Sequence, residues 1–110
     1  MDEPQFRRAA ESALDALKKH LIEREEDQDA GFEVEEQNGV LTVLFVDPAG
    51  KFVITPNAPV RQIWISAMST SFKLDWVAKT GTFVLPRTGE QLIQLVERLI
   101  LERGEDKQRA

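Results

Sequence analysis

The sequence predicts an α+β fold, a two-layer α/β sandwich in which two helices pack on one face of an antiparallel β-sheet of five or six strands. An amphipathic helical pattern stands at each end of the chain, and short β-like runs separated by turn residues lie between them. Strands joined this tightly must pair antiparallel, because a parallel crossover needs about a dozen residues or more. The two amphipathic helices then share one face of the sheet and leave the other to solvent. With 110 residues in all, we predict one domain over residues 1–104 and a tail over 105–110.

The first predicted helix begins after Asp2 and ends at about Glu25. Asp2 is an N-cap residue, Pro4 stands in the first turn, and Gln5 occupies the third helical position of a capping box. Apolar residues then recur with helical spacing and form one stripe for burial: Phe6, Ala10, Ala13, Leu14, Leu17 and Leu21.

The strands of the predicted sheet follow this helix. Phe32 and Val34 alternate with acidic residues, and the dipeptide Asn38-Gly39 favours a type I′ hairpin turn. Residues 40–46 form the second strand, and the sequence Asp-Pro-Ala-Gly at 47–50 predicts another turn. Further short strands are predicted at residues 51–55, 61–66, 71–76 and 82–85.

The second predicted helix closes the chain. We expect Thr88 to cap it, with Gln91 at the capping-box position. Gly104 is the expected stop signal. Its buried stripe comprises Leu92, Leu95, Val96, Leu99 and Ile100.

Composition excludes several classes of function. A chain without cysteine forms no disulfide, no thiolate metal site and no cysteine nucleophile. No nucleophile motif surrounds the Ser/Thr-rich loop near residues 66–71, and there is no glycine-rich phosphate cradle. The longest apolar run, at 40–46, is too short to span a bilayer. The first twenty residues are charged and do not resemble a secretory or transit signal, so we expect a cytoplasmic protein.

The net charge of −5 is concentrated in one segment. Eight acidic residues and a single base, Arg24, lie between positions 23 and 36. Such a surface repels nucleic acid and attracts cations or a basic protein patch. Carboxylates are hard oxygen ligands, which suit Fe²⁺, Fe³⁺, Ca²⁺, Mg²⁺ or Mn²⁺.

Helical spacing brings some of these acids together as candidate metal ligands. Side chains three or four residues apart share a helix face, and we expect Lys19 to form surface ion pairs with Asp15 and Glu23. A solubilising charge run is the alternative interpretation. The candidates are Glu11 and Asp15 in a thin upper group, and Glu23, Glu26, Asp27, Asp29 and Glu33 in a dense lower group.

Trp64 is the second candidate for a functional role. Period-2 alternation places Ile63 and Ile65 on one side of their strand and Gln62, Trp64 and Ser66 on the other. If the isoleucines face the helices, Trp64 lies on the open face, which it shares with aliphatic residues of neighbouring strands. An exposed tryptophan in such a place is typical of a protein-binding hot spot. The alternative is an amphipathic ring that shields the sheet by packing on its neighbours.

Three other polar residues receive structural interpretations. His20, the only histidine, has no orienting partner nearby in the sequence, and we interpret it as a solvated surface side chain. Lys73 and Asp75 alternate outward on one strand, where we expect a cross-strand ion pair or a turn brace.

Several blocks of the sequence resemble the frataxin family in order and spacing, and the length of the loop after Trp64 resembles that of its bacterial CyaY-type members. The blocks are Asn-Gly-Val-Leu-Thr-Val at 38–43, Phe-Val-Ile at 52–54, Pro-Val-Arg-Gln-Ile-Trp-Ile-Ser at 59–66, Leu-Asp-Trp at 74–76 and Gly-Glu-Gln-Leu at 89–92. The resemblance implies weak binding of Fe²⁺ or Fe³⁺ at an acidic ridge on the first helix and first strand. It also implies contact with a cysteine desulfurase and an iron–sulfur scaffold protein through Glu35, Asn57, Gln62 and Trp64.

The sequence departs from the family pattern in three places. Lys18, Lys19 and Ile22 stand where the family usually carries acids, and Thr-Pro-Asn at 55–57 replaces the usual scaffold-contacting stretch. Phe83 stands where a tryptophan is usual.

Three functional hypotheses remain at this stage. The first is a non-enzymatic iron donor or regulator of cluster assembly. The second is a ferroxidase, but a di-iron enzyme needs buried Glu and His ligands, and this chain offers only acids that we expect to be exposed. The third is an interaction module that keeps the fold without metal binding, motivated by the lysines of the ridge.

Overall fold

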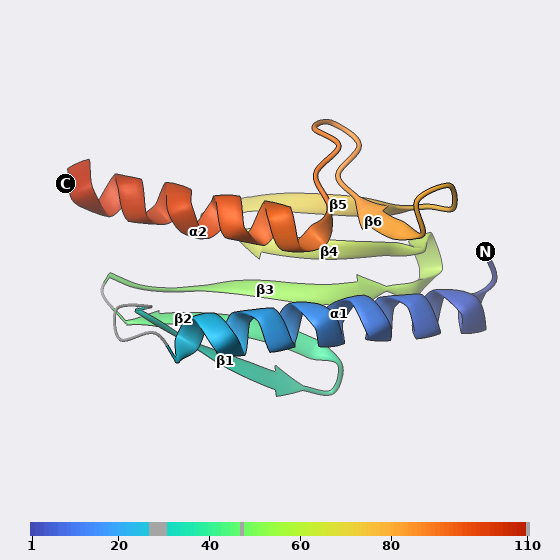
Figure 1. Cartoon of the computed structure of the whole chain (residues 1–110), viewed down its shortest axis with the longest axis horizontal. Coiled ribbons are helices and arrows are strands. Elements are labelled where there is room, and N and C mark those ends of the chain that lie inside the picture. Colours follow the sequence, from blue (N-terminus) through green and yellow to red (C-terminus); the bar gives the residue numbers. More distant parts are fainter. Residues whose placement is uncertain (27–30, 47, 110) are drawn as a thin grey trace.

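The chain folds into two layers, a six-stranded antiparallel sheet with both helices on one of its faces (Figure 1). This computed structural model describes residues 1–26, 31–46 and 48–109, and residues 105–109 by their backbone alone. The strands follow one another across the sheet in chain order, so every connection joins neighbours. The elements are α1 (Glu3–Glu25), β1 (Phe32–Gln37), β2 (Val40–Val46), β3 (Ala49–Asn57), the short 3₁₀ turn η1 (Ala58–Val60), β4 (Gln62–Ala67), β5 (Thr70–Val77), β6 (Thr82–Val84) and α2 (Leu92–Arg109). The predicted fold class is confirmed.

Helix α1 begins and ends where the sequence predicts. The Asp2 carboxylate accepts a hydrogen bond from the Gln5 backbone N–H at 2.8 Å, and the Gln5 side chain accepts one from the Asp2 backbone N–H at 3.0 Å. This reciprocal capping box satisfies two N–H groups that a helix start otherwise leaves without partners. The predicted stripe faces the sheet, with Leu17 and Leu21 fully buried.

The β1–β2 hairpin has the predicted turn. Asn38 and Gly39 have φ values of 53° and 81°, the left-handed conformation that a type I′ turn requires at both positions. The next turn is shorter than predicted, because Ala49 already pairs with Val46 and belongs to β3. Strand β3 also extends to Asn57, beyond the predicted end at residue 55.

Helix α2 differs from the prediction at both ends. It begins at Leu92, and the backbone N–H of Gln91 donates to the Gln94 side chain at 2.9 Å. Thr88 is not the cap, because its hydroxyl accepts from the Glu90 backbone N–H within the preceding turn. Gly104 does not end the helix, which continues to Arg109; this glycine is absent from the residues with positive φ that favour termination. The domain boundary at 104 stays a prediction.

The hydrophobic core lies between the helices and the covered face of the sheet. Apolar side chains from every strand and both helices are buried there, and no polar side chain among the described residues is buried with them. Phe83, at the position where the family usually has tryptophan, packs edge-on against Phe6 and Trp76 with ring centroids 5.8 and 5.1 Å away. None of the described helices is long and apolar enough to cross a membrane.

Candidate acidic ridge and partner-binding face

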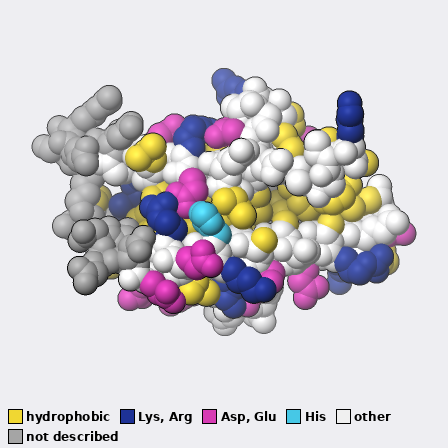
Figure 2. Space-filling view, in the orientation of Figure 1, with side chains coloured by type: hydrophobic (Ala, Val, Ile, Leu, Met, Phe, Trp, Pro, Cys, Tyr) yellow, Lys and Arg dark blue, Asp and Glu magenta, His cyan; other side chains and the backbone are white. Residues whose placement is uncertain are grey.

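The predicted metal ligands that the structure describes are exposed, on α1 and β1. Glu11 and Asp15 lie along α1, Glu23 and Glu26 lie at its C-terminal end, and Glu33 lies at the start of β1. Figure 2 shows acidic and basic side chains interspersed on the face that carries the helices. Asp27 and Asp29, the two other predicted ligands, fall outside the described residues.

Three lysine and arginine side chains of α1 pair with acids of the ridge or its surroundings. Lys19 contacts Asp15 at 3.1 Å, as predicted, but its predicted pair with Glu23 is not formed. Lys18 reaches across to β1 and contacts Glu36 at 3.2 Å. Arg7 contacts Glu3 at 2.9 Å in the first turns of the helix. Within the described part of the chain, no ion pair involves Glu11, Glu23, Glu26, Glu33 or Glu35.

The free carboxylates do not converge on one point. Among residues 1–26, 31–46 and 48–104, no three His, Asp or Glu side chains stand close enough to hold a metal ion together. The dense lower group, whose two middle members lie outside the described residues, therefore stays a prediction.

A polar hollow next to α1 contains Glu36, an acidic residue that is not among the predicted metal ligands. It has a volume of about 390 Å³ and is lined by Arg8, Glu11, Ser12, Asp15 and Glu36. Glu36 follows Glu35 on β1, so the alternation of the strand turns it toward the helix and away from the open face. That same alternation, applied to β1, is the signal that could have placed Glu36 beside Glu11.

The open face of the sheet carries the predicted partner-binding residues. Strand pairing sets Trp64 opposite Thr55 on β3 and Lys73 on β5. It sets Gln62 opposite Asn57 and Asp75 in the next row. Glu35 lies on the same face, at the edge strand β1 and opposite Thr42. The structure therefore gathers Asn57, Gln62 and Trp64 and places Glu35 at the far side of the sheet.

Trp64 itself is half-buried and tied to its neighbours. Its indole N–H donates to the Gln62 side-chain oxygen at 2.8 Å, and the Lys73 ammonium lies 4.8 Å from its ring centroid. The Gln62 amide N–H in turn donates to the Asp75 carboxylate at 2.8 Å. Lys73 and Asp75 do make cross-strand contacts with β4, but their partners are Trp64 and Gln62. The expected ion pair is not formed among the described residues. The geometry fits both a binding platform and a shield for the sheet.

His20 also departs from its interpretation as a solvated side chain. Its Nε2 lies 2.7 Å from the Glu97 carboxylate on α2, and Arg24 pairs with the same carboxylate. The imidazole is 38% exposed and helps to join the two helices. Nothing near His20 in the sequence predicts this contact, because its partner lies 77 residues away.

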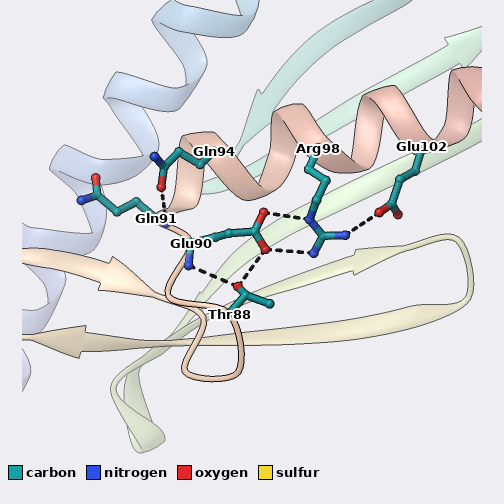
Figure 3. A network of polar contacts seen from close by, with 6 residues as sticks. All are labelled: Thr88, Glu90, Gln91, Gln94, Arg98 and Glu102. Atoms are coloured by element: carbon teal, nitrogen blue, oxygen red, sulfur yellow. Dashed lines mark hydrogen bonds and ion pairs between the residues drawn. The ribbon is translucent and has the colours of Figure 1, made fainter.

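A second polar network stabilises the start of α2 (Figure 3). Arg98 donates to both carboxylate oxygens of Glu90, at 2.7 and 3.0 Å, and to Glu102 at 2.5 Å. The two hydrogen bonds from Arg98, together with one from the Thr88 hydroxyl, hold the pKa of Glu90 below its ordinary value despite partial burial. The two carboxylates raise the pKa of Arg98. Because every member is paired, the network has a structural role.

Comparison with known proteins identifies the family of this chain. Residues 1–106 match the family model described as a frataxin-like domain. The iron–sulfur cluster assembly protein CyaY of Pseudomonas aeruginosa is 32% identical over 83% of this chain and 83% of its own length. Its counterpart in Pseudomonas entomophila is 31% identical over 86% of this chain and 84% of its own length.

A solved structure supports the same assignment at the level of fold. The frataxin of Psychromonas ingrahamii superposes with a TM-score of 0.72, covering 96% of this chain and 93% of that one at 19% identity. By its family match and its relatives, the chain belongs to the frataxin family, among the bacterial CyaY-type members.

Proposed function

We propose that this chain is a non-enzymatic accessory protein of iron–sulfur cluster assembly. The curated relatives carry that role in their names, and the chain matches them over more than four-fifths of its length. The observation that carries the proposal is the set of exposed carboxylates on α1 and β1 that make no ion pair within the described residues. Such groups are available to a cation or to a basic protein surface.

Iron enters this proposal as cargo held weakly by surface carboxylates. An all-oxygen donor set on a helix and a strand suits Fe²⁺ or Fe³⁺ rather than copper or a cluster. Because the described carboxylates form no closed group, an ion bound there keeps much of its water and is held with low affinity and selectivity.

The proposed partners are a cysteine desulfurase and an iron–sulfur scaffold protein. The acidic side of the chain would meet a basic patch of one partner, and the open face around Asn57, Gln62 and Trp64 would contact the other. Glu35 lies on the open face of the acidic edge strand, so it is the residue best placed to join the two surfaces.

A metal titration followed by amide NMR tests the iron-binding part. With anaerobic Fe²⁺, or Co²⁺ as a paramagnetic substitute, we expect perturbation confined to the end of α1 and to β1. Glu23→Gln and, separately, Glu33→Gln should each weaken the response, because each removes a candidate ligand. Glu102→Gln removes the same charge from α2 and should leave the response unchanged. Oxygen consumption no faster than in buffer would exclude the ferroxidase hypothesis.

A second candidate function is an interaction module without significant metal binding. The observation that favours it is the neutralisation of two acids on α1 and β1, Asp15 by Lys19 and Glu36 by Lys18. If millimolar metal perturbs no amide of the ridge, this second function replaces the first.

A further inference from the structure

A chain of three side chains crosses β4 and β5 on the open face. It runs from the Asp75 carboxylate through the Gln62 amide to the Trp64 indole, with both hydrogen bonds 2.8 Å long. Asp75 stands directly opposite Gln62 in the strand pairing, and Gln62 and Trp64 are half-buried neighbours on the same face of β4. Neither established family membership nor the proposed iron site gives Asp75 a role.

The donors and acceptors allow this chain only one orientation. An indole N–H can only donate, and an ionised carboxylate can only accept. Gln62 satisfies both when its oxygen points to Trp64 and its nitrogen to Asp75; the reversed amide would lose both hydrogen bonds. Asp75 and the indole N–H therefore favour the same orientation of the Gln62 amide, and Asp75 anchors its nitrogen end without a hydrogen bond to Trp64.

We propose that Asp75 is a positioning residue that fixes the Gln62 amide and, through it, the orientation of the Trp64 indole. This proposal rests on the proposed function, in which Trp64 meets a protein partner. The only polar atom of the indole is already paired within the sheet, and Lys73 lies over the ring. The partner then meets ring carbons, so the matching surface is apolar at this point and not a hydrogen-bond acceptor for the indole.

The orientation can be observed without any partner. The side-chain N–H of each tryptophan gives its own NMR signal, and the Trp64 signal is identified by its loss in Trp64→Phe. We expect Asp75→Ala to shift this signal and to speed its hydrogen exchange, because Gln62 loses its anchor. Asp75→Asn keeps an acceptor oxygen and should retain part of the wild-type signal. Ser71→Ala, on the same face of β5 and outside the chain of hydrogen bonds, is the matched control and should change nothing.

Binding to a desulfurase–scaffold complex gives the second measurement. We expect Asp75→Ala to raise the dissociation constant about two- to tenfold, which is the effect of losing one net hydrogen bond. The dissociation constant of Asp75→Asn should lie between those of Asp75→Ala and the wild type. A Trp64 signal that is unmoved in Asp75→Ala would overturn the positioning role. A moved signal with unchanged affinity would overturn the claim that this orientation serves the partner contact. If the wild-type chain does not bind the complex at all, the proposed partner function fails, while the indole signal still decides whether Asp75 orients Trp64.

Discussion

The turn between β4 and β5 offers the sharpest test of how local sequence supports this fold. Ala67 pairs with Thr70, so the turn contains only Met68 and Ser69. Their φ values of 52° and 63° place both in the left-handed region. The β1–β2 turn has the same two-residue form, but there the residues are Asn38 and Gly39, which adopt this conformation readily. The β4–β5 turn therefore carries backbone strain that its counterpart avoids.

Replacing Met68-Ser69 by Asn-Gly should raise the free energy of unfolding. A left-handed conformation costs an ordinary residue about 1–2 kcal/mol. Glycine removes this cost at position 69, and asparagine removes part of it at position 68. Against this gain, glycine makes the unfolded chain freer, which lowers stability by about 0.4–1 kcal/mol. The net gain is about 1–2 kcal/mol, and each kcal/mol corresponds to about 4–8 °C in Tm for a domain of this size.

Guanidinium chloride unfolding at 25 °C would measure the effect, with an unchanged m-value as evidence that both states remain comparable. The reciprocal variant Asn38→Met/Gly39→Ser is the matched control and should lose stability by a similar amount, because it places the same strain in the other hairpin. If Met68→Asn/Ser69→Gly is no more stable than wild type while the reciprocal variant is destabilised, the two turns are not equivalent and the strain argument is refuted.

Two further predictions concern the partner face and the network at α2. Trp64→Ala should leave the far-UV circular dichroism unchanged but weaken binding to the desulfurase–scaffold complex by about tenfold or more, as for a hot-spot aromatic. Leu101 is a more exposed apolar residue on α2, and Leu101→Ala should not weaken this binding. Because Arg98 lowers the pKa of Glu90, this pair stabilises the fold above the ordinary carboxyl pKa of 4.5 and loses that contribution as pH falls through the lowered value. Arg98→Leu should therefore lower the free energy of unfolding at pH 7. Between about pH 5 and 3, this free energy should fall less steeply in the variant than in the wild type. Arg87→Leu, which removes an exposed charge outside the pair, should keep the wild-type pH dependence.

The elements with strong local signals were predictable from sequence. The N-terminus of α1 follows from Asp2 and Gln5, whose side chains and backbone satisfy each other within one turn. The first hairpin follows from Asn38-Gly39, and the alternation of Ile63 and Ile65 correctly identifies the covered face of β4. In each case the interaction that decides the structure lies within a few residues of the signal.

The errors at α2 arise where two local signals compete. Thr88 and Gln91 have the spacing of a capping box, but Thr88 instead bonds to Glu90 and closes the turn that also involves Gly89. The helix then starts four residues later, at Leu92. Gly104 costs a helix interior about 1 kcal/mol, which is too little to end it when residues on both sides continue the helix.

The parts of the site that the sequence did not predict depend on contacts between segments that are far apart in the sequence. His20 meets Glu97 across the two helices, and Asp75 meets Gln62 across two strands. Glu36 joins Glu11 in one hollow only because β1 runs beside α1. Composition and spacing identify the residue types in such contacts, but only the packing of helices on the sheet selects the partners.

The end of α1 shows why the carboxylates there remain available. Acids near a helix C-terminus oppose the helix dipole by about 0.3–1 kcal/mol each, so a base in the last turn would normally offset them. Arg24 is the basic residue of that turn, yet its guanidinium pairs with Glu97 on α2. Glu23 and Glu26 are thus left exposed without an ion pair among the described residues. The contact that holds the two helices together also keeps this end of the ridge negative, which is the condition that a bound cation or a basic partner requires.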